Sequence, residues 1–126
     1  GYYVYVGTYN IYEKGTHAYM GWFEVDKYYD ADGTRIYVYI HPDDLQSSLP
    51  AVFFIKAFIY YWNGNTWTKV DELVWLVWGL PADYYGYCRY LTYSGYYQVI
   101  VVYYLWTAPF AEGYSDVFWV TVGAVA

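Results

Sequence analysis

Residues 30–40 read Asp-Ala-Asp-Gly-Thr-Arg-Ile-Tyr-Val-Tyr-Ile, and this stretch predicts the fold class. Its Asp32-Gly33 pair is a strong hairpin signal, because Gly readily adopts the backbone angles of tight turns. From position 36 to position 40, aliphatic residues alternate with tyrosines. That two-residue period is typical of a half-buried strand. The stretch therefore predicts a turn that leads directly into a β-strand.

Similar runs of aromatic and β-branched residues recur on both sides of this stretch, separated by Gly, Pro, Asn and Asp. One segment, His41–Pro50, is helix-like and has room for one or two turns around Asp43–Leu49. We expect seven or eight strands in an all-β, antiparallel, jelly-roll-like β-sandwich with one short helix. The expected strands are Tyr2–Val6, Ala18–Val25, Arg35–Ile40, Ala51–Trp62, Thr66–Val70 with Leu73–Trp78 (one bent strand or two), Tyr84–Thr92, Tyr96–Trp106 and Ser115–Val122.

The composition restricts the classes of partner. The chain has 126 residues, enough for one domain, and 28% of them are aromatic. Only 14% are charged, against roughly 25% in an ordinary soluble protein. We therefore expect much of the surface to be covered by copies of the chain, a partner or lipid. A net charge of −6 with scattered Lys and Arg argues against nucleic acid, and no apolar run is long enough for a membrane span.

The first strand lies at the extreme N-terminus and needs a pairing partner. Tyr2–Val6 is strongly β-prone, and a more polar stretch with Gly15 as a hinge follows it. The strand pairs either within its own sheet or in the sheet of a neighbouring copy. Repeated head to tail, the second arrangement makes an open fibre. We therefore divide the chain into a donor strand and linker, residues 1–16, and a β-sandwich domain, residues 17–126.

Two acidic segments are candidates for cation binding. Asp30, Asp32 and Gly33 resemble the start of a calcium loop, although no Glu stands at the twelfth position. The alternative is a solvated Asp-Gly turn. The pair Asp43 and Asp44 has its own alternative, the cap of a helix N-terminus. Because calcium takes about six to eight oxygen ligands, a site would combine loops or two subunits.

The sequence contains no recognisable catalytic motif, and we expect that the protein is not an enzyme. His17 and His41 lie on separate segments, and Cys88 lies within an expected strand, where a cysteine usually acts as a small hydrophobe. Exposed Trp and Tyr can stack on sugar rings, so a carbohydrate-binding module is the alternative to an assembly protein. The tryptophans around the Asn63–Asn65 turn are Trp62, Trp67, Trp75 and Trp78.

The order of segments resembles that of the cannula-forming proteins of hyperthermophilic archaea, which are small β-sandwich subunits that polymerise outside the cell. About two-thirds of the chain takes part in the resemblance, and no diagnostic motif carries it. The segments concerned are Met20–Val25, Arg35–Ile40, Asp43–Leu49, Ala51–Tyr61, Gln98–Trp106 and Asp116–Ala126.

The resemblance implies a structural subunit of an extracellular filament or tube, secreted after removal of a signal peptide. It also implies assembly by donor-strand complementation and calcium as a supporting cofactor. This chain is shorter at its N-terminus and richer in Tyr than the family pattern. The implied donor residues are Tyr2, Tyr3, Val4, Tyr5 and Val6. The implied calcium ligands are Asp26, Asp30, Asp32, Asp43 and Asp44.

Overall fold

The regular elements are all β-strands over residues 1–43, 49–79 and 82–123, which the computed structural model describes. Every pair of neighbouring strands is antiparallel, which confirms the all-β, antiparallel part of the predicted fold. None of these residues belongs to a helix that could cross a membrane. The strands are β1 (Tyr2–Glu13), β2 (Tyr19–Asp30), β3 (Gly33–Pro42), β4 (Val52–Trp62), β5 (Trp67–Trp78), β6 (Tyr84–Tyr87), β7 (Gly95–Leu105), β8 (Ala108–Tyr114) and β9 (Phe118–Val120).

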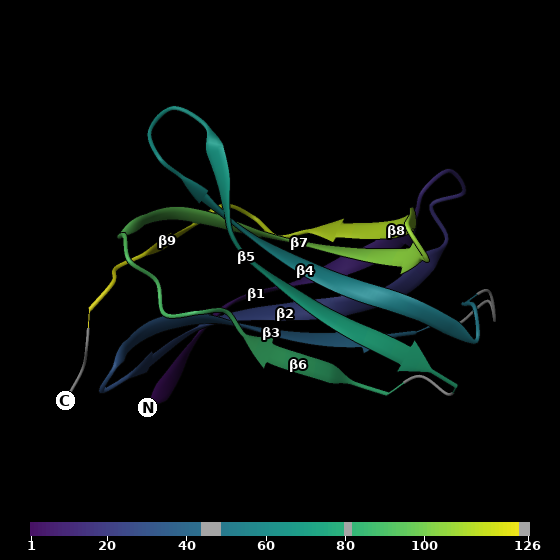
Figure 1. Cartoon of the computed structure of the whole chain (residues 1–126), viewed down its shortest axis with the longest axis horizontal. Coiled ribbons are helices and arrows are strands. Elements are labelled where there is room, and N and C mark those ends of the chain that lie inside the picture. Colours follow the sequence, from purple (N-terminus) through teal and green to yellow (C-terminus); the bar gives the residue numbers. More distant parts are fainter. Residues whose placement is uncertain (44–48, 80–81, 124–126) are drawn as a thin grey trace.

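The strands form one sheet in the order β5-β4-β7-β8-β1-β2-β3-β6, with β9 paired to β7. The sheet folds over so that its two halves face each other, in a flattened and nearly closed barrel (Figure 1). Its two edge strands, β5 and β6, meet through side chains: the Trp75 indole donates to the Tyr85 carbonyl at 3.3 Å. The result is sandwich-like, with one core between the halves.

Alternation along the strands explains the core. In β3 the aliphatic residues Ile36, Val38 and Ile40 are fully buried, while the tyrosines between them lie on the outward face. Two tyrosines, Tyr97 and Tyr103, are buried in the core as well. Each satisfies its hydroxyl by donating to a backbone carbonyl, which removes the cost of burying that group.

The first strand is longer than the sequence predicts. The pattern predicts that it ends before Gly7, whereas β1 continues to Glu13. The pairing with β2 shifts register between Tyr5 and Gly7, so Val6 forms a bulge and the strand resumes beyond it. Ile11 is fully buried and holds this second half of β1 in the core. The polar residues of that half lie on the solvent side. Because of them, the sequence pattern does not predict a strand there.

The described residues form nine strands, where the sequence predicts seven or eight, because the pattern does not predict β8. Pro109 to Gly113 is predicted as a turn, but those residues lie within β8 and pair with β7. Pro109 lies where that pairing shifts register, a position that tolerates a missing N–H. Conversely, the expected strand Tyr84–Thr92 shortens to β6, and Thr66–Trp78 becomes one continuous strand. Most of the predicted helix, at residues 44–48, lies outside the described residues.

Candidate functional site

The predicted donor segment, Tyr2–Val6, forms the first half of β1 and pairs with β2 of its own chain. Val6 packs against the core, and the Tyr2 ring stacks on Tyr29 with a centroid distance of 5.2 Å. The four side chains before Val6 remain largely open to solvent. Their exposed fractions are 50% for Tyr2, 50% for Tyr3, 37% for Val4 and 61% for Tyr5.

Tyr3 is the centre of an aromatic cluster on the outward face of β1, β2, β3 and β6. Its ring lies 4.9 Å from Tyr28, 5.1 Å from Tyr37 and 6.4 Å from Tyr87, measured between centroids. The hydroxyls of Tyr3 and Tyr87 are hydrogen-bonded, and this bond, followed by burial, raises the pKa of Tyr3 well above its usual value. The cluster fixes the segment through rings as well as through the backbone.

The other edge of this strand is free. Over the described residues, the backbone of residues 2–11 hydrogen-bonds to β2 alone, and β8 meets β1 only at Tyr12 and Glu13. No charged residue occurs between Tyr2 and Tyr12. Natural sheet edges usually carry Lys, Pro or inward charges that prevent pairing with another chain. This edge has none of them, so it is open to strand addition.

The acidic turn between β2 and β3 is satisfied internally. One carboxylate oxygen of Asp30 accepts the backbone N–H groups of Asp32 and Gly33, at 2.8 and 3.1 Å. The other oxygen accepts the Tyr90 hydroxyl at 2.6 Å. The Tyr90 hydrogen bond is the largest of the causes that lower the pKa of Asp30. The residues therefore form a hydrogen-bonded hairpin turn.

Asp26 lies elsewhere, in the middle of β2, opposite Tyr5 of β1 and Tyr37 of β3. It is 6% exposed, and its Oδ1 atom has no hydrogen-bond partner among the described residues. Burial, followed by the neighbouring Glu24 carboxyl, raises the pKa of Asp26 to about 7. Glu24 is an acidic neighbour that the sequence reading does not single out, because its proximity follows only from the strand.

Asp43 follows β3 and lies near His41, with 4.0 Å between its Oδ2 atom and the His41 Nε2 atom. Asp44 lies outside the described residues. Within residues 1–43, 49–79 and 82–123, no three His, Cys, Asp or Glu side chains come together as a metal-binding group. Of the described candidates, Asp30 and Asp32 share one turn, while Asp26 and Asp43 lie elsewhere in the chain.

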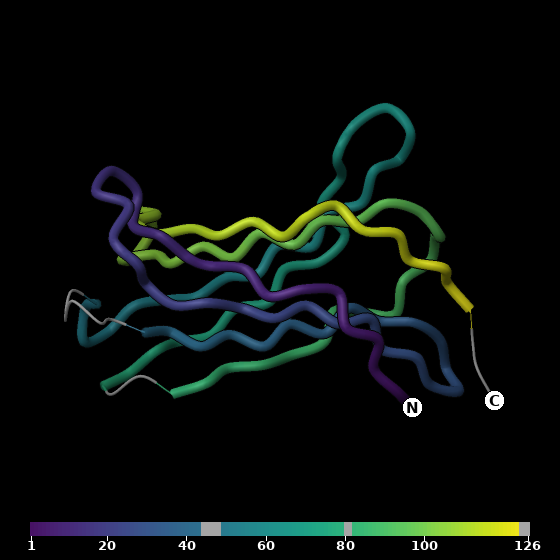
Figure 2. Tube along the Cα trace, turned by 180° about the vertical axis from the view of Figure 1, so that it is seen from behind, coloured from purple at the N-terminus to yellow at the C-terminus, as the bar shows by residue number. Residues whose placement is uncertain are grey.

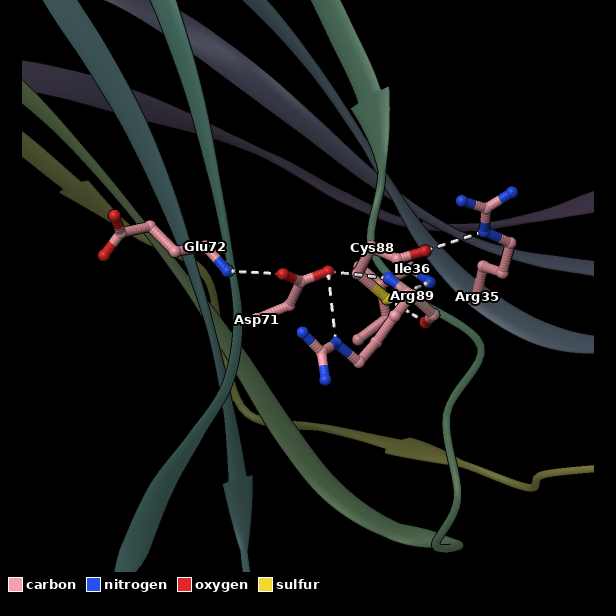
Figure 3. Close-up of polar contacts among 6 residues, drawn as sticks. All are labelled: Arg35, Ile36, Asp71, Glu72, Cys88 and Arg89. Carbon is pink, nitrogen blue, oxygen red and sulfur yellow. Dashed lines mark hydrogen bonds and ion pairs between the residues drawn. The ribbon is translucent and has the colours of Figure 1, made fainter.

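Cys88 follows β6 and is fully buried (Figure 3). Its Sγ atom accepts the Ile36 N–H at 3.1 Å and donates to the Arg89 carbonyl at 3.0 Å. Burial raises the pKa of the Cys88 thiol to about 12, so the nucleophilic thiolate is not formed at neutral pH. The expectation of a packed, unreactive cysteine agrees with this environment.

Asp71 of β5 closes the barrel beside Cys88. One of its oxygens accepts the Glu72 N–H at 2.8 Å, and the other accepts the Arg89 N–H at 2.7 Å (Figure 3). On the far side, Arg35 donates to the Cys88 carbonyl at 2.7 Å. Asp71 thus joins β5 to the segment after β6, and that segment is joined to β3 by Arg35 and by the Cys88 N–H, which donates to the Ile36 carbonyl at 2.9 Å.

A second polar group, missed by sequence reasoning, joins β3 to residue 83. The His41 Nδ1 atom lies 2.6 Å from Asp83, and the Tyr39 hydroxyl donates to the same carboxylate. Burial opposes the ionised form of Asp83, but the hydrogen bonds from Tyr39 and His41 outweigh it and lower its pKa. The Trp22 ring stacks on His41 at 5.2 Å. The signal in the sequence is too weak to find this group, because residues 41 and 83 are far apart.

The four tryptophans around the β4–β5 hairpin do not form one row. Trp62 and Trp67 face each other across the hairpin at 5.5 Å between centroids. With Tyr96 and Val117 they line a shallow hollow of about 290 Å³. Trp75 lies half-buried against β6, and Trp78 lies at the far end of β5. Only the first pair could therefore stack on a planar ligand together.

A second hollow, of about 250 Å³, lies at the end of the molecule where β5 and β7 finish. Among the described residues its lining carries no charge, and Trp78 and Trp106 are 75% and 80% exposed. Trp106 has a φ of 56°, a left-handed conformation that non-glycine residues rarely adopt. The sequence gives no sign that these residues meet. The hollow is lined by Val52, Phe53, Phe54, Leu76, Trp78, Leu105 and Trp106.

No protein-family model, curated protein or solved structure matches the chain at a significant level. The resemblance to cannula-forming subunits therefore stays a prediction that rests on the order of segments. Any functional conclusion has to come from the surfaces described above.

Proposed function

We propose that this chain is a structural subunit of an extracellular filament or tube. It polymerises by donor-strand complementation, in which Tyr2–Val6 adds to the sheet of a neighbouring copy. The observation that carries the proposal is the free edge of β1, which is exposed, uncharged and hydrogen-bonded on one side only. Backbone groups at such an edge supply affinity for another strand, and the alternating side chains supply specificity.

The energetics favour repeated contacts over an isolated pair of copies. An aromatic side chain offers roughly 150–250 Å², so the exposed parts of Tyr2, Tyr3 and Tyr5 amount to roughly 300 Å². At about 25 cal/mol per Å², burying that area contributes roughly 7 kcal/mol. Two copies that associate lose translational and rotational freedom, at a cost of roughly 4–15 kcal/mol. Burial of the donor side chains alone therefore leaves little net binding free energy. A polymer adds backbone pairing and further contacts at every step.

Other properties support the extracellular and structural parts of the proposal. The low charge fits a surface covered by copies of the chain. Cys88 is buried and hydrogen-bonded, so an oxidising environment would find no accessible thiol. The proposed calcium would bind between copies, where turns such as the one at Asp32 bring exposed carboxylates from two chains together.

The test is removal of the donor. We expect a variant that lacks residues 1–6 to stay folded by circular dichroism and to form no fibres by negative-stain microscopy. A second variant, Tyr5→Lys, places a charge on the free edge and should also block assembly. The matched control is Tyr85→Lys, since Tyr85 is 62% exposed and Tyr5 61%. Regular fibres from the truncated chain would refute strand donation.

A carbohydrate-binding module is the second candidate, favoured by the Trp62–Trp67 pair and its shallow hollow. Asn63 and Thr68 are hydrogen-bonded beside the pair and could contact sugar hydroxyls. In this case a monodisperse, monomeric sample should bind polysaccharide, and Trp67→Ala should abolish binding. A monomer that binds no glycan would exclude this candidate.

A further inference from the structure

The apolar hollow at the end of β5 and β7 lies far from the N-terminus. In both views the N-terminus is at one end of the long axis, and the β7–β8 turn that carries Trp106 is at the other (Figures 1 and 2). We propose that this hollow, together with the adjacent edge of β5, is the acceptor that receives Tyr2–Tyr5 of the next copy. The inference rests on the proposed function, and it names the partner surface of the donor strand.

The placement of the two surfaces determines the geometry of the polymer. A donor at one end and its acceptor at the other make a heterologous contact, in which different patches of the two copies meet. Such a contact leaves one free donor and one free acceptor after every addition. A chain of copies therefore grows without closing, and the resulting filament is polar.

Charge restricts where two copies can meet. Each copy carries a net charge of −6, which opposes contact between most parts of the surface. Tyr2–Tyr5 contains no charged residue, and neither does the part of the hollow's lining that the structure describes. Farther along β4 and β5, Lys56 and Glu72 form an ion pair at 3.8 Å. The two surfaces are therefore suited to each other and lack the repulsion found elsewhere.

Size favours a side chain over a free small molecule as the occupant. The hollow holds about 250 Å³, below the roughly 300–1,000 Å³ of small-molecule sites. It is also almost wholly apolar, so it lacks the convergent polar groups that orient a soluble ligand. An aromatic ring on a strand fits such a hollow, because the strand backbone supplies the polar pairing outside it.

The edge of β5 provides that pairing. Among the described residues, the backbone of residues 73–78 hydrogen-bonds to β4 and to no other strand. The charged residues of β5, Lys69, Asp71 and Glu72, all precede this half. Leu73 and Trp75 lie against Gly86 of β6, so residues 76–78 form the open part of this uncharged edge, directly beside the hollow that Leu76 and Trp78 line.

Trp106 is the first residue of the two-residue turn between β7 and β8. The favoured turns of this length take a positive φ at that position, as Trp106 does. The turn holds an 80% exposed indole beside Phe54, with 6.4 Å between ring centroids. In the proposed contact, the indole forms one wall for the incoming Tyr side chains.

The small area of the proposed contact predicts weak binding between two copies. The exposed parts of Trp78 and Trp106 add roughly 300 Å² to the roughly 300 Å² of the donor. The total lies below the roughly 1,200 Å² of stable pairwise interfaces. Two copies should therefore bind weakly, and fibres should appear only above a threshold concentration.

The test is a mixing experiment with acceptor and donor variants of the full chain. Leu76→Lys places a charge in the hollow and should abolish fibres, and Trp106→Lys should do the same. Val117→Lys is the matched control, since Val117 is 50% exposed and Leu76 47%, and it should assemble normally. A mixture of Leu76→Lys, which keeps its donor, with the chain that lacks residues 1–6, which keeps its acceptor, should form heterodimers in analytical ultracentrifugation.

The outcomes separate the two proposals. Fibres from Leu76→Lys, with none from the truncated chain, would overturn the acceptor and leave strand donation intact. Fibres from the truncated chain would overturn both. A wild-type monomer that binds phosphatidylcholine vesicles, and loses this binding on Trp106→Lys, would show that the hollow meets lipid and would also overturn the inference.

Discussion

Glu24 and Asp26 lie two residues apart on the outward face of β2, and the Asp26 carboxyl is buried beside the Glu24 carboxyl with one oxygen unpartnered. Tyr5 of β1 and Tyr37 of β3 flank Asp26 in the sheet. No Lys or Arg stands opposite either carboxyl in the strand register. A charge on the buried Asp26 carboxyl beside Glu24 is unfavourable, so Asp26 keeps its proton up to about pH 7.

This pair makes stability depend on pH. The pKa of Asp26 is about 7 in the folded chain, against about 3.9 for an unfolded Asp. Between these values the folded state binds the extra proton, so stability should fall as the pH rises from 4 to 7 and then level off. Asp26→Asn should remove this slope and stabilise the chain at pH 8 by about 1–3 kcal/mol. Thermal denaturation from pH 4 to pH 9 measures both effects.

Asp83 is the control, because its effect on the pH dependence of stability has the opposite sign. Its pKa is lowered in the folded chain, so its contribution to stability is present above the unfolded value and disappears as the pH falls. Asp83→Asn should therefore reduce stability at pH 7 more than at pH 3. If Asp26→Asn kept the wild-type slope of stability between pH 4 and pH 7, the raised pKa of Asp26 could not be the cause of that slope.

Cys88 should be chemically silent in the folded protein. Because its thiol is fully buried and its pKa is about 12, a thiol reagent such as dithiobis-nitrobenzoate should label it only after unfolding. Labelling in rising urea should then follow the unfolding transition seen by fluorescence. Rapid labelling without denaturant would contradict the buried position.

Asp71 should matter more than its neighbour Glu72. Asp71→Ala leaves the Arg89 N–H without its partner at the barrel closure, which should cost about 1–3 kcal/mol. Glu72 makes half-exposed ion pairs with Lys56 and Lys69, so Glu72→Ala should cost less than about 1 kcal/mol. Urea denaturation of both variants gives the comparison, and equal losses would show that Asp71 does not close the barrel.

Calcium should speed fibre formation and should leave the stability of the single chain unchanged. Since the described carboxylates of one copy form no ligand group, calcium should speed fibre formation of the wild type and a chelator should slow it. The melting temperature of the truncated, monomeric chain should not change on adding calcium. A calcium-dependent rise in that temperature would place the site within one copy.

Particular residues show how far sequence reasoning reaches. The alternation around Ile36–Ile40 predicts β3 almost to its ends, because strand period and turn chemistry are local properties. β8 was missed since Pro109 and Gly113 read as a turn, and only pairing with β7 makes them a strand. In the candidate site, Tyr2–Val6 could be identified from composition and position. The hollow around Trp106 could not, because β4, β5 and β7 bring it together from three distant segments.

The sequence alone thus determined the antiparallel all-β class and the unusual N-terminal strand, both of which follow from local patterns of apolar residues and turns. The tertiary structure decided that residues 2–11 of β1 pair along one edge only and that an apolar hollow lies at the opposite end of the molecule. It also decided that Asp26 shares its environment with Glu24. These relationships depend on strand order and register, which long-range packing selects among many pairings that the local pattern allows equally.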